Sequence, residues 1–166
     1  MSTAAAHTRS PDEDARSYAQ RKRAEKRRAA ESIGVDAGYI DHLVESFYGR
    51  VRGDDLLGPI FAARIADWPT HLARMKGFWR SVLHNSGEFS GNPMLKHMAI
   101  PGLELRHFER WLELFYATLR DAETHPEATA LVGGRARMIA DSLLTAIAMR
   151  RDGIVGARAG KDLPHV

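Results

Sequence analysis

His97 is the residue whose surroundings point most directly to chemistry. It lies within residues 84–104, a stretch with three glycines and two prolines that allows at most one short helix, from Met94 to Met98. Long connections with little regular structure inside a compact domain are usually functional. Apolar neighbours disfavour the charged form of an imidazole, and a neutral imidazole can hold Nδ1–H on a backbone carbonyl while Nε2 binds iron or zinc. His97 is therefore a candidate metal ligand, although a lone histidine is more often an ordinary core or surface residue.

The composition narrows the kind of metal site. The sequence contains no cysteine, which excludes disulfides, thiolate zinc sites, cysteine-bound iron–sulfur clusters and a thiol nucleophile. Zinc would need a cluster of histidines and carboxylates, and no HExxH or similar spacing occurs. Four further histidines lack ligand spacing and are expected at the surface: His42, His84, His107 and His125. Haem needs only one protein ligand for its iron, together with a large apolar slot. Large side chains could line such a slot or form an ordinary core: Phe47, Phe61, Phe78, Trp79, Phe89, Phe108, Trp111 and Phe115.

Three residues carry polar hydrogens on or beside the apolar stripes of different predicted helices. These are Tyr48, His71 and Trp111, and each must find a partner when it is buried. Donors in a dry pocket would stabilise the partial negative charge of a diatomic ligand on ferrous iron. The alternatives are a tyrosine hydroxyl at the surface, a histidine facing solvent and a tryptophan bonded to a carbonyl.

The elements that must position these residues are helical. Apolar residues recur at helical spacing in four stripes, within residues 40–51, 68–82, 105–119 and 139–147. Asp67 is a plausible N-cap for the second stripe, with Pro69 in its first turn. We find no convincing run with period two, so the sequence predicts an all-α domain.

The chain divides into three parts by composition and charge. Residues 1–35 form a basic extension, expected to be flexible or helical, residues 36–151 a folded domain, and residues 152–166 a disordered tail. Residues 1–32 hold eight of the 24 Lys and Arg but only five of the 21 Asp and Glu, so the remainder is formally neutral. The extension is either a basic arm for nucleic acid or anionic lipid, or a solvated leader. With no apolar run of membrane-spanning length and no secretory signal, a soluble cytoplasmic protein is expected.

The segment from about Tyr39 to Arg151 resembles the group III truncated haemoglobins. The order and spacing of several motifs carry this resemblance: Phe47-Tyr48, Leu57-Gly58-Pro59-Ile60-Phe61, Trp68-Pro69-Thr70-His71, Gly77-Phe78-Trp79, Gly91-Asn92-Pro93 before Lys96-His97, and Phe108 before Trp111-Leu112-Glu113-Leu114-Phe115. The resemblance implies a two-over-two helical sandwich around haem b (iron protoporphyrin IX).

The resemblance also implies roles for individual residues. His97 matches the proximal iron ligand, while Tyr48 and Trp111 match residues beside the bound ligand. His71 matches a distal histidine that can act as a gate, or it could bind iron as a sixth ligand. Further pocket residues are implied, among which Met75 stands where an aliphatic residue is more usual: Phe47, Phe61, Met75, Phe78, Trp79, Met94 and Phe108.

The implied function is binding of O2, CO, NO or cyanide at a His-ligated iron. Donors that slow ligand escape favour ligand chemistry, such as nitric oxide dioxygenation or peroxide handling, or sensing, over oxygen transport. Such chemistry could involve a reductase partner, which the sequence does not identify, and the sequence leaves open whether the protein is an enzyme. The alternative is a non-haem helical interaction domain whose basic arm binds nucleic acid or a membrane surface, although the sequence gives no firm partner of either kind.

Overall fold

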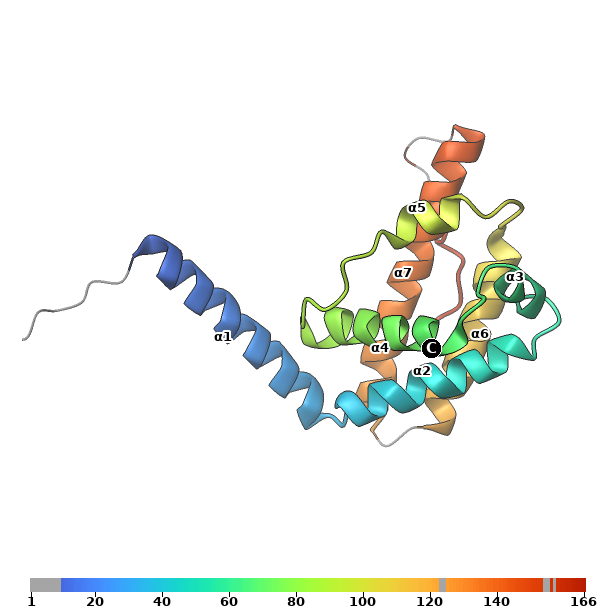
Figure 1. Cartoon of the computed structure of the whole chain (residues 1–166). Helices are drawn as coiled ribbons and strands as arrows, with labels where there is room; N and C mark the ends of the chain where they lie inside the picture. Colours follow the sequence, from blue (N-terminus) through green and yellow to red (C-terminus); the bar gives the residue numbers. More distant parts are fainter. Residues whose placement is uncertain (1–9, 123–124, 154–155, 157) are drawn as a thin grey trace, which may run out of the picture.

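The computed structural model describes residues 10–122, 125–153, 156 and 158–166 (Figure 1). Across these ranges the regular secondary structure is entirely helical, which confirms the predicted all-α class. Seven helices are described: α1 Pro11–Ser32, α2 Ala37–Arg52, α3 Gly58–Ala62, α4 Trp68–His84, α5 Pro93–Met98, α6 Leu105–Asp121 and α7 Pro126–Asp152.

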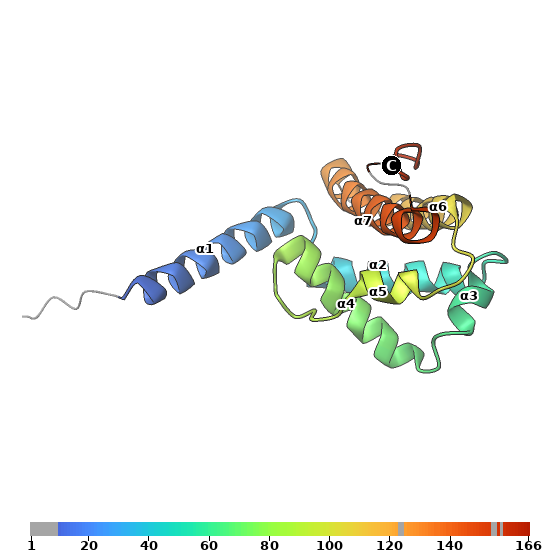
Figure 2. The same ribbon diagram turned by 90° about the horizontal axis from the view of Figure 1, so that it is seen from above.

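Four of these helices form two layers of antiparallel pairs. Helix α2 pairs with α4, α6 pairs with α7, and α2 also packs against α6. Figure 2 shows the α6/α7 pair above the α2/α4 pair, with the short helix α3 at one edge and α5 drawn across the middle of α2. This arrangement is the two-over-two sandwich that the family resemblance implies.

Local sequence signals fix where the helices begin. The Asp67 carboxylate accepts hydrogen bonds from the Thr70 N–H and hydroxyl, at 3.1 and 2.6 Å, which caps α4 as predicted. Asn92 caps α5 in the same way by accepting from the Leu95 N–H at 3.1 Å. Proline is the first residue of α5 and lies near the start of α4. Its missing N–H costs nothing there, because N–H groups in the first turn of a helix have no intrahelical acceptor.

Interlocking aromatic and aliphatic side chains form the core between the layers. Phe47 of α2 and Phe115 of α6 are both almost fully buried, and their rings meet edge to face at 5.1 Å. Leu43, Leu112 and Leu119 are inaccessible to solvent beside them. Each such side chain stabilises the fold by about 1.5–3 kcal/mol, so this contact holds α2 and α6 in register.

A buried carboxylate fixes the turn between α2 and α3. Asp54 accepts hydrogen bonds from the Leu56 and Leu57 N–H groups at 3.1 and 2.9 Å, and from Arg110 Nε of α6 at 2.7 Å. Burial alone would raise the pKa of Asp54, but these donors outweigh it and lower the pKa. The turn, and with it the start of α3, is therefore tied to α6. Gly58 fits here because a Cβ would lie 3.0 Å from the Arg52 carbonyl oxygen.

Helix α1 extends away from the sandwich, and only its C-terminal part packs (Figure 1). Ser10 and Glu13 form a capping box at its start. Near its end Ala30 is buried, and Lys26 Nζ donates to the Val82 carbonyl of α4 at 2.9 Å. The basic extension is thus helical over residues 11–32.

The structure differs from the sequence expectation at the C-terminus, where residues 158–166 pack rather than form a disordered tail. Leu163 is only 2% exposed, and the Tyr116 hydroxyl of α6 donates to the Pro164 carbonyl at 2.8 Å. Arg137 Nε of α7 donates to the Leu163 carbonyl at 3.1 Å. Glycine, proline and mixed charges suggested disorder, but side chains of α6 and α7 satisfy these carbonyls and give Leu163 an apolar site. Residues 154–155 and 157 of the predicted tail lie outside the described residues.

Two histidines expected at the surface are buried instead. His84 Nε2 donates to the Val35 carbonyl at 2.7 Å, and His107 Nδ1 accepts from the Glu104 N–H at 3.0 Å. Each finds a backbone partner that its sequence spacing does not reveal, which makes burial of the imidazole tolerable. His42 and His125 are exposed, as expected.

Among the described helices, none is both long and apolar enough to span a bilayer.

The packing of the C-terminal segment can be tested with Leu163→Ala. Deleting a buried leucine side chain leaves a cavity, and we expect the free energy of unfolding to fall by about 2–3 kcal/mol. Urea unfolding followed by circular dichroism measures this. Lys161→Ala is the matched control, because the Lys161 side chain is exposed and its hydrogen bonds are made by its backbone, which the substitution keeps. Equal stability of the two variants would show that the segment does not pack in solution.

Candidate haem-binding site

A hydrogen bond to the backbone fixes the imidazole of His97. His97 lies in α5, a six-residue helix that packs against α7, and its Nδ1 donates to the Pro93 carbonyl at 2.7 Å. With the proton held on Nδ1, Nε2 carries the lone pair that a metal requires. The side chain is partly buried. His97 is thus oriented as the sequence analysis anticipated, and it can supply one nitrogen ligand.

A cluster of aromatic rings forms where α2, α3 and α4 meet. The buried Tyr48 ring stands at 90° to the His71 ring, with the centroids 5.1 Å apart. Phe61 of α3 lies 5.9 Å from Tyr48, and Trp68 lies 6.1 Å from Tyr48 and 5.7 Å from His71. The structure therefore brings Tyr48, His71 and Phe61 together, as the predicted site requires.

The third predicted donor, Trp111, belongs to an adjoining stack in α6. Its ring is nearly parallel to that of Phe115, at 12° and 5.3 Å, and Phe115 in turn stacks on Trp79 at 5.1 Å. Phe47 meets Trp111 edge to face at 5.3 Å and Tyr48 at 5.0 Å. Phe47 is therefore the link between Trp111 and Tyr48.

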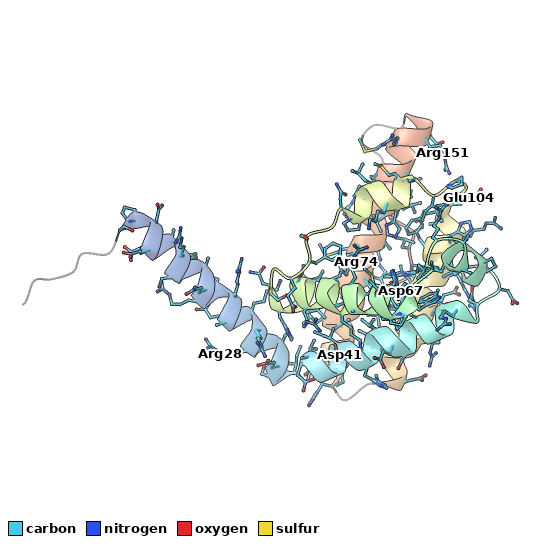
Figure 3. All side chains as sticks on the ribbon, in the orientation of Figure 1. Arg28, Asp41, Asp67, Arg74, Glu104 and Arg151 are labelled. Carbon is cyan, nitrogen blue, oxygen red and sulfur yellow. The ribbon has the colours of Figure 1, made fainter. Side chains whose placement is uncertain are left out.

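His71 has a buried nitrogen without a partner. Nε2 is enclosed and makes no hydrogen bond within the part of the chain that the structure describes. Burial lowers the pKa of His71, and the nearby charges of Arg74 and Lys96 lower it further. Figure 3 shows Arg74 on the side of α4 that faces α5. His71 is thus held neutral, and its unused Nε2 is the strongest sign in this region that a ligand belongs here.

The other predicted pocket residues divide into two groups. Trp79 and Phe108 are buried in the core, as Phe47 is. The rest are partly buried and pack against that core from α4 and α5: Met75, Phe78 and Met94. Phe78 also contacts Phe89 of the following loop at 5.1 Å. Among described residues no ring contact joins His97 to Tyr48, His71 or Trp111, so His97 and these donors stay two separate groups.

Sequence reasoning missed Trp68 and three cations, Arg52, Arg74 and Lys96. Trp68 contacts Tyr48 and His71, and the Arg52 guanidinium lies over the Trp68 ring, 4.7 Å from its centroid. Trp68 and Arg74 lie three residues before and after His71, a spacing that places side chains on one helix face and could have identified them. Lys96 immediately precedes His97 but affects His71, which sequence spacing does not reveal.

The donor set suits an iron porphyrin better than a metal held only by side chains. One histidine presents a lone pair, and a separate group of aromatic donors surrounds an unpartnered imidazole. Haem requires one axial protein ligand and a largely apolar pocket that contains a few hydrogen-bond donors on the distal side. These residues therefore fit haem.

The two antiparallel pairs and this site define a two-over-two helical globin, and comparisons with known proteins agree. No protein-family model matches the chain. A group 3 truncated hemoglobin of Campylobacter jejuni is 37% identical over 105 residues, which cover 61% of this chain and 82% of that protein. The chain therefore belongs to the group 3 truncated haemoglobins.

Two crystal structures extend the comparison. The group III truncated hemoglobin from Campylobacter jejuni matches with a TM-score of 0.64 at 34% identity, covering 68% of this chain and 91% of the other. The 2/2 hemoglobin from Synechococcus sp. PCC 7002, in the cyanomet state with covalently attached heme, matches with a TM-score of 0.61 at 23% identity. That second likeness covers 70% of this chain and 97% of the other and shows the fold.

The electrostatic control of His71 can be tested with Arg74→Gln. Removing a nearby positive charge makes protonation easier, so we expect the pKa of His71 to rise toward its ordinary value of about 6.5. An NMR titration of the imidazole in the diamagnetic carbon monoxide form of the loaded protein measures this. Arg16→Gln is the control, because Arg16 is exposed on the projecting part of α1. A pKa that is unchanged or lower in Arg74→Gln contradicts the assignment.

Proposed function

We propose that this chain is a haem globin in which His97 binds the iron of haem b, within the domain formed by residues 36–151. The hydrogen bond from His97 Nδ1 to the Pro93 carbonyl is the observation that carries this proposal. That bond selects the tautomer with a free Nε2 and makes the imidazole a stronger ligand. Haem b, when bound, supplies an iron coordination position for O2, CO, NO or cyanide.

Tyr48 is the main donor to the bound ligand in this proposal. Burial raises the pKa of its hydroxyl well above the ordinary value, so the group stays protonated and can donate. Phe47 and Phe61 both contact the Tyr48 ring edge to face, at 5.0 and 5.9 Å between centroids. Trp111 is the second donor, and its stacking on Phe115 fixes the indole plane.

His71 has two possible roles, and its neutral imidazole suits both. With a proton on Nε2 it is a donor and a gate over the ligand, whereas a lone pair on Nε2 would let it bind iron as a sixth ligand. Ferric spectra of the wild type and His71→Gln distinguish these roles. A low-spin spectrum that becomes high-spin in the variant would assign iron ligation, and an unchanged spin state would assign the gate.

The proposed role is ligand chemistry rather than oxygen transport. Charge-assisted hydrogen bonds from buried donors slow the release of a bound ligand, and a carrier must release oxygen readily. Nitric oxide dioxygenation and peroxide reduction both fit such a pocket, with His71 as the neighbouring acid–base candidate for the second. Both reactions consume electrons from outside the chain, so a reductase partner belongs to this proposal.

The assignment of His97 can be tested with His97→Gly. The wild-type protein should be coloured, and the variant should bind haemin at least about tenfold more weakly and lose the ferrous histidine-bound spectrum, because the axial ligand is gone. Added imidazole should restore that spectrum. His42→Gly, on the exposed face of α2, is the matched control. A colourless wild-type protein, or an unchanged ferrous spectrum in His97→Gly, would overturn the assignment.

The donor role can be tested with Tyr48→Phe. Loss of a charge-assisted hydrogen bond is worth about 1.5–3 kcal/mol, which should speed O2 dissociation by about 10- to 100-fold. Stopped-flow measurement of O2 release gives the rate. Tyr116→Phe removes another tyrosine hydroxyl, which donates to Pro164 instead, and should leave the rate unchanged. Equal rates in Tyr48→Phe and the wild type would transfer the role to Trp111 or His71.

A further inference from the structure

An apolar groove lies between α1, α4 and α7, outside the proposed haem site. It has a volume of about 260 Å³. Six apolar residues line it: Ala29, Ala30, Ile33, Val82, Leu83 and Leu131. Helix α1 forms one wall, and it precedes Tyr39, where the family resemblance begins. The groove is therefore a feature of this chain's own extension.

Two cations, Lys26 and Arg135, complete the lining of the groove. Lys26 Nζ donates to the Val82 carbonyl at 2.9 Å, and Arg135 lies near enough to help lower the pKa of Lys26, after the larger effect of burial. No carboxylate forms an ion pair with either cation among the described residues. On the same helix, by contrast, Lys22 is paired with Glu25 and Arg27 with Glu31. Two adjacent positive charges without an anion thus border an apolar surface.

The volume limits the size of a ligand. A water molecule occupies about 30 Å³, and a methylene group is of similar size, so the groove holds about eight or nine methylenes. An anionic head would pair with the two cations, and an acyl chain would cover the apolar lining of the groove.

We propose that this groove binds a free medium-chain fatty acid anion of about eight to ten carbons, the length that its volume allows. The carboxylate would lie between Lys26 and Arg135, and the acyl chain would cover Ile33, Val82 and Leu131. None of these residues belongs to the haem site, so the haem would remain in place when the groove is filled.

Isothermal titration calorimetry of the haem-containing full chain tests this, with hexanoate, octanoate and decanoate as probes. We expect one site, with affinity rising about two- to fourfold for each added methylene. Lys26→Gln and Arg135→Gln should each weaken decanoate binding about tenfold. Arg28→Gln is the matched control, because Arg28 extends from the side of α1 away from α4 (Figure 3) and should bind like the wild type.

Further variants separate binding from folding. Because Lys26 also holds α1 on α4, Lys26→Arg keeps the charge and should keep most of the affinity, whereas Leu131→Trp fills the groove and should abolish binding. The absorption spectrum of the haem should not change on titration, since a change would place the fatty acid in the haem pocket and overturn the proposal. Equal affinity of decanoate for Lys26→Gln and Arg28→Gln would also overturn it. Binding only to phosphatidylglycerol vesicles would identify a membrane surface instead.

Discussion

The site depends on one hydrogen bond, from His97 Nδ1 to the carbonyl of Pro93 four residues earlier. Pro93 is the first residue of α5, and the Asn92 side chain caps that helix through the Leu95 N–H. The same short turn therefore places the acceptor and the imidazole at fixed spacing. One short helix thus supplies both the imidazole and the backbone acceptor that orients it.

The opposite side of the site depends on tertiary contacts rather than on one turn. Tyr48 comes from α2, His71 from α4 and Trp111 from α6, so their positions follow from how the two layers pack. Phe47 is central to this, because it touches Tyr48, Trp111 and Phe115 at 5.0–5.3 Å. Asp54 adds a polar tie, because it joins the turn before α3 to Arg110 of α6. The carboxylate of this ion pair is buried while the Arg110 side chain is 44% exposed, and the pair anchors the turn that leads into α3 and Phe61.

Sequence reasoning succeeded where a signal is local. Capping residues and prolines mark the starts of α4 and α5, and helical periodicity marks α2 and α6, so the helices that carry the candidate site residues were predictable, whereas their two-layer arrangement was implied by the family resemblance. It failed where the partner is remote. The carbonyls of Leu163 and Pro164 accept hydrogen bonds from side chains of α7 and α6, and His84 donates to the Val35 carbonyl. Lys96 helps to lower the pKa of His71. Composition carries no information on such pairings, because each depends on which surfaces the tertiary fold brings together.

His71 places a polar nitrogen without a hydrogen-bond partner, Nε2, inside an apolar region. A buried polar atom without a hydrogen bond lowers stability by about 1–3 kcal/mol. A leucine at position 71 would avoid that loss and would pack against Tyr48 and Trp68 as well. Burial and the charges of Arg74 and Lys96 act together to keep the ring neutral, whereas the buried His84 and His107 each have a backbone hydrogen-bond partner. The unpartnered nitrogen lowers stability in the protein alone, and the ligand proposed for this site would offer Nε2 a partner. A ligand at this position is therefore the simplest physical reason for the side chain.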